Sequence, residues 1–429
     1  MLSTTKKLSN KDISNNNGAG KPCSAPHLVP RMKMLLLALL TQVQAHLPMR
    51  NDSMQTLQTR WQFSTKDQIR TTPFIIGETI YVGGNDGILY ALDKNNGHVR
   101  WQKNLQAPIK SDIVGEGKTL YIYTTKGTVY AIQADKGDVT WQVPGEAEKE
   151  MDAWDYYTAS PAIHPQYIIV GRGNGKVQAI QKQTGKIAWT YDTKAMIHAS
   201  PIVQDSAVYV GNYKGQLLQI QTHTGKPGWT FQTIGDRHFP AGEIQRAPLL
   251  KDGILYFGSR DYNIYAVSAS SGRGIWNMKE LGSWVIATPT IVDKTMFVGT
   301  SDTHRFYALQ DGDGSLKWKL PLNMRVYGSA VVQNGTVYFG CFNGKLIGAD
   351  QQTGKMNYVF QTQGSKANYA TVFGPDDHFK PGFELYSDNT PDAEQKILAL
   401  GAILSTPVVD GKTMYVTSTD GNIYAVALP

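Results

Sequence analysis

The amino-acid sequence predicts an all-β protein, an eight-bladed β-propeller of four-stranded antiparallel blades. The first observation is a pattern that recurs eight times between residue 61 and the last residue. Its repeated aromatic residue is spaced by 40, 40, 48, 40, 47, 42 and 40 positions. A period near forty with several short strand signals per unit is typical of a propeller and not of a helical solenoid. The repeated residues are Trp61, Trp101, Trp141, Trp189, Trp229, Trp276, Trp318 and Tyr358.

Each unit contains four strand signals in the same order. In the first complete unit an inner strand follows Thr72-Pro73, where the missing proline N–H interrupts no ladder. An alternating run at 79–82 is a second strand, and Asp86-Gly87 supplies the positive φ of a tight hairpin. A third strand follows at 89–92, and a turn ending in Gly97 leads to the outer strand with its tryptophan. We expect one blade from each such unit.

The two ends of the repeat region predict how the ring closes. The last unit has three strand signals and stops at Pro429 without an outer strand, whereas residues 58–63 look like an outer strand with no blade of their own. We therefore expect the N-terminal strand to pair with the C-terminal blade. Such closure removes the sheet edges that otherwise promote aggregation.

The aromatic residue of each outer strand has a predicted structural role. A glycine lies four residues before every tryptophan of the repeat except Trp61, as Gly97 does before Trp101, because the turn needs a left-handed residue. Each ring is expected to cover the neighbouring blade, and burial of one ring contributes about 2–3 kcal/mol. The alternatives are that these sites are phosphate-binding loops, or that the rings stack on bases or a ligand.

The charge distribution divides the chain. The formal net charge is +7, but residues 1–45 hold six Lys and Arg against one Asp, so the remainder is almost neutral. A near-neutral body argues against nucleic-acid binding. We interpret 1–31 as a disordered extension or a mis-assigned start, 32–45 as a signal peptide, and 46–429 as one propeller. The alternative for 32–45 is an amphipathic or buried segment.

The predicted signal peptide has consequences for location. Its apolar run, residues 34–40, is too short to span a bilayer. We therefore expect an exported protein, periplasmic or secreted, with no transmembrane segment. The chain has two cysteines, Cys23 and Cys341, and no structural disulfide is expected once the signal is removed.

The repeat resembles that of pyrroloquinoline-quinone (PQQ)-like propellers. The resemblance is carried by Tyr81-Val-Gly83, by the run Gly87-Ile-Leu-Tyr-Ala-Leu-Asp93 and by Thr184-Gly-Lys-Ile-Ala-Trp189, and it covers residues 58–429. It implies the propeller fold. It leaves activity open, because the fold includes quinoprotein dehydrogenases and non-enzymatic scaffolds, of which the BamB-like outer-membrane assembly scaffold is closest in size and type.

The enzyme interpretation has little support in the sequence. Enzymes of this family use PQQ with Ca²⁺ and a pair of adjacent cysteines beside the quinone, and this chain has no such pair. Residues 311–315 (DGDGS) resemble the start of a calcium loop but lack its later glycine and glutamate, so we interpret them as a turn. We predict no catalytic residue, no metal site and no cofactor, with a quinone- or small-ligand-binding protein as the alternative function.

Several cations are expected around the mouth of the central channel, because they lie just before the inner strands. They are Arg70, Lys110, His198, Arg246 and Arg325. Such a ring could bind an acidic ligand, either a tricarboxylate quinone or a partner's carboxylates. The alternative is that these residues are solvated surface charges.

Three links between blades are longer than the others and are candidate partner-binding segments. They are residues 144–158, 234–246 and 363–404, and we interpret the third as a lid rich in aromatic residues. The residues of interface type in the first two are Trp154, Tyr156, Tyr157, Arg237, His238 and Phe239. We expect a monomeric scaffold that binds a protein partner, with aromatic cover of the propeller and carbohydrate binding as alternatives for these residues.

Overall fold

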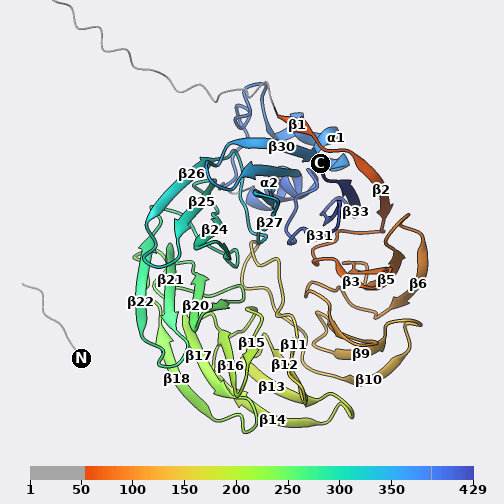
Figure 1. Ribbon diagram of the computed structural model, residues 1–429, viewed down its shortest axis with the longest axis vertical. Coiled ribbons are helices and arrows are strands. Elements are labelled where there is room, and N and C mark those ends of the chain that lie inside the picture. Colours follow the sequence, from red (N-terminus) through yellow and green to blue (C-terminus); the bar gives the residue numbers. More distant parts are fainter. Residues whose placement is uncertain (1–53, 388) are drawn as a thin grey trace, which may run out of the picture. The chain divides into compact units, whose positions relative to one another are not determined.

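The computed structural model describes residues 54–387 and 389–429. In this part of the chain, eight sheets follow one another around a ring, and each sheet is one blade (Figure 1). The eight-bladed all-β fold is therefore confirmed. The predicted extension over 1–31 and the predicted signal peptide over 32–45 lie outside the described residues.

In blades 1 to 7 the strands run outward from the channel in chain order. Blade 1 is β3 (Phe74–Ile76), β4 (Thr79–Gly83), β5 (Ile88–Asp93) and β6 (Val99–Asn104). Blade 2 is β7 (Val114–Glu116), β8 (Thr119–Tyr123), β9 (Val129–Gln133) and β10 (Val139–Val143). Blade 3 is β11 (Ala162–Ile163), β12 (Tyr167–Gly171), β13 (Lys176–Gln181) and β14 (Ile187–Asp192). Blade 4 is β15 (Ile202–Gln204), β16 (Ala207–Gly211), β17 (Gln216–Gln221) and β18 (Pro227–Gln232).

The second half of the ring has the same order. Blade 5 is β19 (Leu249–Lys251), β20 (Ile254–Gly258), β21 (Asn263–Ser268) and β22 (Gly274–Lys279). Blade 6 is β23 (Thr290–Val292), β24 (Thr295–Gly299), β25 (Arg305–Gln310) and β26 (Leu316–Pro321). Blade 7 is β27 (Val331–Gln333), β28 (Thr336–Gly340), β29 (Lys345–Asp350) and β30 (Met356–Gln361). Blade 8 is β31 (Val408–Asp410), β32 (Thr413–Thr417), β33 (Asn422–Ala427) and β2 (Thr59–Ser64).

The polar residue that precedes many inner strands links neighbouring blades. The Asp112 carboxylate accepts the Thr72 N–H at 2.7 Å, and the Ser160 hydroxyl accepts the Asp112 N–H at 2.8 Å. The Ser200 hydroxyl accepts the Ser160 N–H at 2.8 Å. These N–H groups lie beyond the ladder of their own short strand, so a side-chain acceptor from the next blade satisfies them.

The tryptophans interlock consecutive blades. Trp61 Nε1 donates to the Lys94 carbonyl of the next blade at 3.0 Å, and a Cβ at Gly97 would lie only 2.5 Å from the Trp61 ring. The same pair of contacts recurs for all seven tryptophans of the repeat. The turn glycine is thus required for two reasons: the turn has a positive φ there, and a side chain would collide with the indole of the preceding blade.

The ring closes as predicted, through antiparallel pairing of β2 with β33 in which Gln62 lies opposite Tyr424. Figure 1 shows β2 beside β33, although these strands lie at opposite ends of the described chain. A second closing contact was not predicted. Strand β1 (Gln55–Thr56) pairs in parallel with β30, and Gln55 lies opposite Tyr358. In the other blades, the turn between the third and the outer strand packs against the aromatic residue of the preceding blade. In blade 8 these two strands come from opposite ends of the propeller, so no such turn covers Tyr358, and β1 pairs beside Tyr358 instead.

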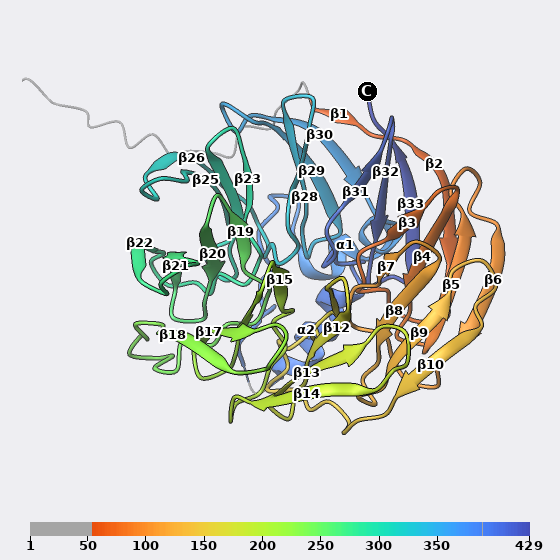
Figure 2. The ribbon, with the colours of Figure 1, turned by 60° about the horizontal axis from the view of Figure 1, so that its bottom comes forward.

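The long link from blade 7 to blade 8, residues 363–404, contains two helices that the sequence analysis did not predict. They are α1 (Gln363–Val372) and α2 (Thr390–Leu398), and we call the whole link the lid. The Thr362 hydroxyl caps α1 by accepting the Ser365 N–H. Helix α2 lies inside the ring of outer strands in both views (Figures 1 and 2). No helix among the described residues is long and apolar enough to cross a membrane.

The lid has a hydrophobic core of its own above the channel. Buried side chains of the lid, including Phe373 and Ile397, pack against Met324 and Phe342 of the blade region and against Tyr156. These residues belong to a single cluster separate from the cores between blades. The lid therefore buries apolar side chains as a stable part of the fold does.

Candidate functional site

The candidate site is the mouth of the channel, where the link between β10 and β11 runs into the centre of the ring (Figure 1). We call its residues 146–157 (EAEKEMDAWDYY) the strap. The strap contains no helix or strand. The Glu148 N–H donates to the Thr125 carbonyl at 2.8 Å, and three further backbone N–H groups bond within the strap, those of Met151, Trp154 and Asp155. Side chains make most of its described contacts with the blades.

A buried imidazolium holds the strap at two points. His198 Nδ1 lies 2.9 Å from Asp155 Oδ2, and His198 Nε2 lies 3.1 Å from Glu148 Oε2. The three side chains are at most 5% exposed. The hydroxyl of Tyr213 donates to Asp155 Oδ1 at 2.7 Å, and the Gly173 N–H donates to Glu148 Oε1 at 3.1 Å.

The two carboxylates set the charge of His198. Burial by itself lowers the pKa of this imidazole, but the hydrogen bonds and negative charges of Asp155 and Glu148 outweigh burial and raise the pKa to about 9. Burial by itself would raise the pKa of Asp155. The hydrogen bond and the positive charge of His198 outweigh burial, so the pKa of Asp155 lies below its usual value. At neutral pH His198 is therefore a cation that donates from both ring nitrogens.

Other acidic residues of the strap pair with cations from other blades. Asp152 accepts a bidentate contact from the Arg260 guanidinium, with N–O distances of 2.5 and 3.2 Å. The Arg260 side chain is 3% exposed and also lies 4.2 Å from the centroid of the Trp284 ring. Glu150 pairs with Lys110 at 2.5 Å. A planar guanidinium suits this two-point contact, so Asp152 is held in one orientation.

The aromatic residues of the strap lie against three more arginines. The distances from guanidinium carbon to ring centroid are 5.3 Å for Arg70 and Tyr156, 4.1 Å for Arg246 and Tyr157, and 4.4 Å for Arg325 and Trp154. Cation–π contacts of this kind are stronger when water is excluded. The structure thus brings all five predicted mouth cations together, and each of them contacts the strap.

The lid covers the strap from outside. The Tyr157 hydroxyl donates to the Leu404 carbonyl at 2.9 Å, and Arg325 Nη2 donates to the Tyr386 hydroxyl at 3.0 Å. Arg325 Nη1 lies 3.4 Å from Glu394 of α2. Burial raises the pKa of Glu394 to about 8. Strap and lid therefore form one closed layer over the channel.

Several residues of the site were missed by the sequence analysis. Arg172 and Arg260 occupy the turn after the second strand, where blade 1 has small or amide residues. The acids of the strap recur at every second position from 146 to 152, followed by Asp155. The sequence did carry a signal for these contacts. An arginine stands in a turn that is otherwise rich in glycine, and the link between blades 2 and 3 has an acid at every second position. What the alternation could not reveal is which blade supplies each cation.

The predicted partner-binding residues have different exposures. Arg237 and His238 are exposed, whereas Tyr156 and Tyr157 are 2% and 4% exposed and belong to the lid's core. Phe239 is half-buried against Trp284, with ring centroids 5.0 Å apart. A partner on this face would therefore meet Arg237 and His238 before the two tyrosines.

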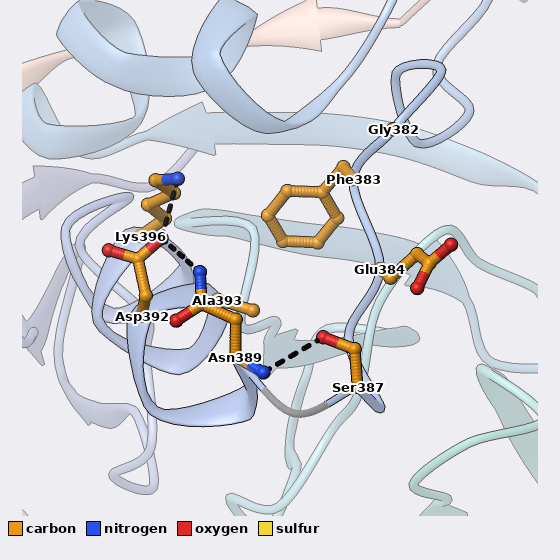
Figure 3. Close-up of a pocket in the computed structure, with 8 residues that line it drawn as sticks. All are labelled: Gly382, Phe383, Glu384, Ser387, Asn389, Asp392, Ala393 and Lys396. Carbon is orange, nitrogen blue, oxygen red and sulfur yellow. Dashed lines mark hydrogen bonds and ion pairs between the residues drawn. The ribbon is translucent and has the colours of Figure 1, made fainter.

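Two cavities of about 390 Å³ each lie beside the strap. The first is lined by charged residues that include Lys110, Glu150 and His198. The second is lined by rings that include Trp154, Phe239 and Trp284, with Arg325 among them. A smaller cavity of about 130 Å³ lies between α2 and residues 382–387 (Figure 3). Two of its charged groups, Asp392 and Lys396, pair with each other at 2.7 Å, and all of its lining residues belong to the lid.

The remaining candidate features of the sequence have structural explanations. Residues 311–315 form the turn between β25 and β26, in which Gly314 has φ 71° and packs against Trp276. Cys341 is buried, and burial raises the pKa of its thiol to about 12. In the described part of the chain, no group of three or more His, Cys, Asp or Glu side chains is arranged so that it could hold a metal ion.

The fold and the site together define a class of protein: an eight-bladed propeller whose channel mouth is closed by segments of its own chain. The sequence model of the family described as "Outer membrane protein assembly factor BamB" matches residues 54–277 and 236–371. The chain belongs to this family, and the predicted resemblance is confirmed. No curated protein sequence matches the chain.

Solved structures that resemble the propeller include a BamB protein and quinone-family dehydrogenases. The crystal structure of BamB from Moraxella catarrhalis is 17% identical, with a TM-score of 0.65 over 87% of this chain and 100% of that one. A europium-containing methanol dehydrogenase is 13% identical, with a TM-score of 0.66 over 87% and 93%. The quinohemoprotein alcohol dehydrogenase ADHIIG from Pseudomonas putida HK5 is 12% identical, with a TM-score of 0.63 over 87% and 76%. At these identities the likeness concerns the fold.

Proposed function

We propose that the chain is a non-catalytic scaffold of the cell envelope, exported by residues 32–45, that binds a protein partner on the face carrying the strap and the lid. The observation that carries this proposal is the closed mouth. The cations that could hold a small anionic ligand are already in contact with the strap, as the pairs of His198 and Arg260 illustrate. The family description, an outer membrane protein assembly factor, supports the same conclusion.

The fit of a quinone cofactor can be tested against these residues. A planar tricarboxylate at the mouth would need free cations and a flat space between two covering groups. Instead, Tyr156 and Tyr157 fill the centre, and Arg70 and Arg246 lie against their rings. The residues present do not fit the quinone at this position, and we derive no reaction through it.

The binding surface that remains is formed by the exposed tip of the 234–246 link. Arg237 and His238 project there, next to the aromatic cavity of about 390 Å³ that Phe239 lines. Exposed cationic residues beside a ring-lined hollow have the composition of protein interfaces. A rigid propeller holds this link in place, so binding requires little ordering.

A paired substitution tests the proposal. Arg237→Ala/His238→Ala should lower partner capture at least tenfold, measured by photo-crosslinking in envelopes of cells that make the protein. The matched control is His98→Ala/Lys136→Ala, which removes a histidine and a cation from exposed turns of the third-to-fourth strand type. Both proteins should melt at the wild-type temperature. Equal capture by the two variants would contradict the assigned surface.

A second measurement addresses the enzyme alternative. Titration of the purified 46–429 protein with PQQ and Ca²⁺ in a calorimeter should give no saturable heat. Saturable one-to-one binding would overturn the scaffold proposal and justify a screen for dye-linked alcohol oxidation.

A further inference from the structure

We propose that the channel mouth is a binding site for an extended acidic and aromatic polypeptide segment, and that the strap is its built-in occupant, which a partner's segment of the same chemistry replaces. This inference rests on the proposed function and names the partner's chemistry. The strap is held as a peptide ligand is held, by side chains that reach separate pockets and cations. Its backbone joins no sheet of the propeller.

The cations that hold the strap come from several blades. Arg260 follows the second strand of blade 5, Lys110 precedes blade 2, His198 precedes blade 4, and Lys176 begins the third strand of blade 3. These four pair with Asp152, Glu150, Glu148 and Glu146 in turn. The spacing of acids that fits the mouth is therefore built into the rigid ring, and any chain with that spacing would meet the same partners.

The mouth without the strap would be strongly cationic. Its cations are Arg70, Lys110, Arg246, Arg260 and Arg325, and His198 joins them when carboxylates occupy the mouth, since those carboxylates set its charge. The blades and the lid supply few carboxylates to balance them, chiefly Asp302 near Arg325 and Glu243 near Arg260, since burial favours the neutral acid at Glu394. Such a concentration of one charge in a concave site attracts an acidic chain and speeds its association.

The strap is accessible at one end and anchored at the other. The side chains of Glu146 and Glu150 are 69% and 61% exposed, whereas those of Glu148, which lies between them, and of Asp155 are 5% and 1% exposed. Cavities of about 390 Å³ lie beside the strap, one at Glu150 and one at Trp154. Exchange would therefore start at the exposed acidic end, where a competing chain has room, while Tyr156 and Tyr157 stay packed beneath the lid.

The test uses a synthetic peptide as the partner. The probe is a fluorescein-labelled peptide with the sequence of residues 146–157, and its anisotropy is measured with the full-length protein. The variant Glu148→Gln/Glu150→Gln/Asp152→Asn weakens the strap's own contacts and should bind the probe at least tenfold more tightly than wild type. Binding should weaken as salt is raised, because the contacts are ionic. A peptide with all its acids replaced by amides should not bind.

A matched variant separates exchange from a general loss of negative charge. Glu116→Gln/Asp138→Asn/Asp205→Asn removes three exposed acids away from the mouth and should bind the probe no better than wild type. Absence of probe binding by a strap variant that still unfolds cooperatively would overturn the proposal. It would leave the proposed function standing, because capture through Arg237 and His238 is measured separately.

A measurement on the wild-type protein covers the case in which the strap variant does not fold. Hydrogen exchange of the amides of residues 146–154 should accelerate when the peptide is added at saturating concentration, since the displaced strap is solvated. Unchanged exchange at saturation would overturn the proposal as well.

Discussion

The pH dependence of stability should report the buried contact between His198 and the strap. His198 is 2% exposed and lies between Asp155 and Glu148, and these contacts raise its pKa from 6.5 to about 9. The folded protein thus binds the proton more tightly than the unfolded chain does. This contribution to stability is fully present below about pH 6.5, falls as pH rises through the window up to about 9, and is lost above it.

The magnitude follows from the size of the shift. One unit of pKa corresponds to about 1.4 kcal/mol, so the proton on His198 contributes roughly 3 kcal/mol at low pH. Between about pH 7 and 9.5 the contribution should fall by about 2 kcal/mol. Asp155, Glu148 and Tyr213 face the imidazole, and the lowered pKa of Asp155 keeps that carboxylate ionised in this range.

The assay compares wild type with His198→Gln in urea unfolding at several values of pH in that window. Gln keeps one N–H donor for a carboxylate but does not titrate. Groups common to both proteins cancel in the difference, which should shrink by about 2 kcal/mol from about pH 7 to 9.5. A difference that stays constant over this range would refute the assignment of His198 as the imidazolium that holds the strap.

Two further predictions concern the fold. Gly225→Ala should destabilise the protein by about 3 kcal/mol, because its Cβ would lie 2.7 Å from the Trp189 ring at φ +68°, adding a clash to the cost of a left-handed alanine. Gly253→Ala is the control, because Gly253 has φ +75° and a Cβ there would meet no atom within 4 Å. This substitution should lower the free energy of unfolding by only about 1–2 kcal/mol. Equal losses of stability for the two variants in urea unfolding would exclude the interlocking role of the indole. Deletion to leave 65–429 removes β1 and β2 and should abolish cooperative melting in a calorimeter, whereas 51–429 should melt cooperatively. A similar melting temperature for both would contradict closure by β2.

The site could be predicted in part. The five cations were located because an inner strand must begin at the channel, and a residue just before it must lie at the mouth. Their partner was not located. Arg246 and Tyr157 are 89 positions apart in sequence, and nothing local indicates that they meet. The burial of Tyr156 and Tyr157 was likewise invisible, because aromatic residues in a long link are equally consistent with an interface and with a core.

The helices of the lid were missed for a related reason. Helix α1 contains Gly364 and has few apolar residues, and only Gly364, Ser365 and Val372 of it are buried. Its position is fixed by the surface beneath it, where the Gln363 N–H meets the Tyr424 hydroxyl and the Gly364 N–H meets Asp420. Tertiary contacts of this kind override weak local preference.

The sequence by itself determined the number of blades, the four strands of each blade and the closure of the ring by β2. It could do so because these features repeat, and a repeat carries its geometry in short-range signals such as turn glycines and alternating strands. Only the tertiary structure decided what lies at the mouth. Ion pairs such as that of Arg260 with Asp152 join segments 108 positions apart, and they form only after the closed ring has brought those segments face to face.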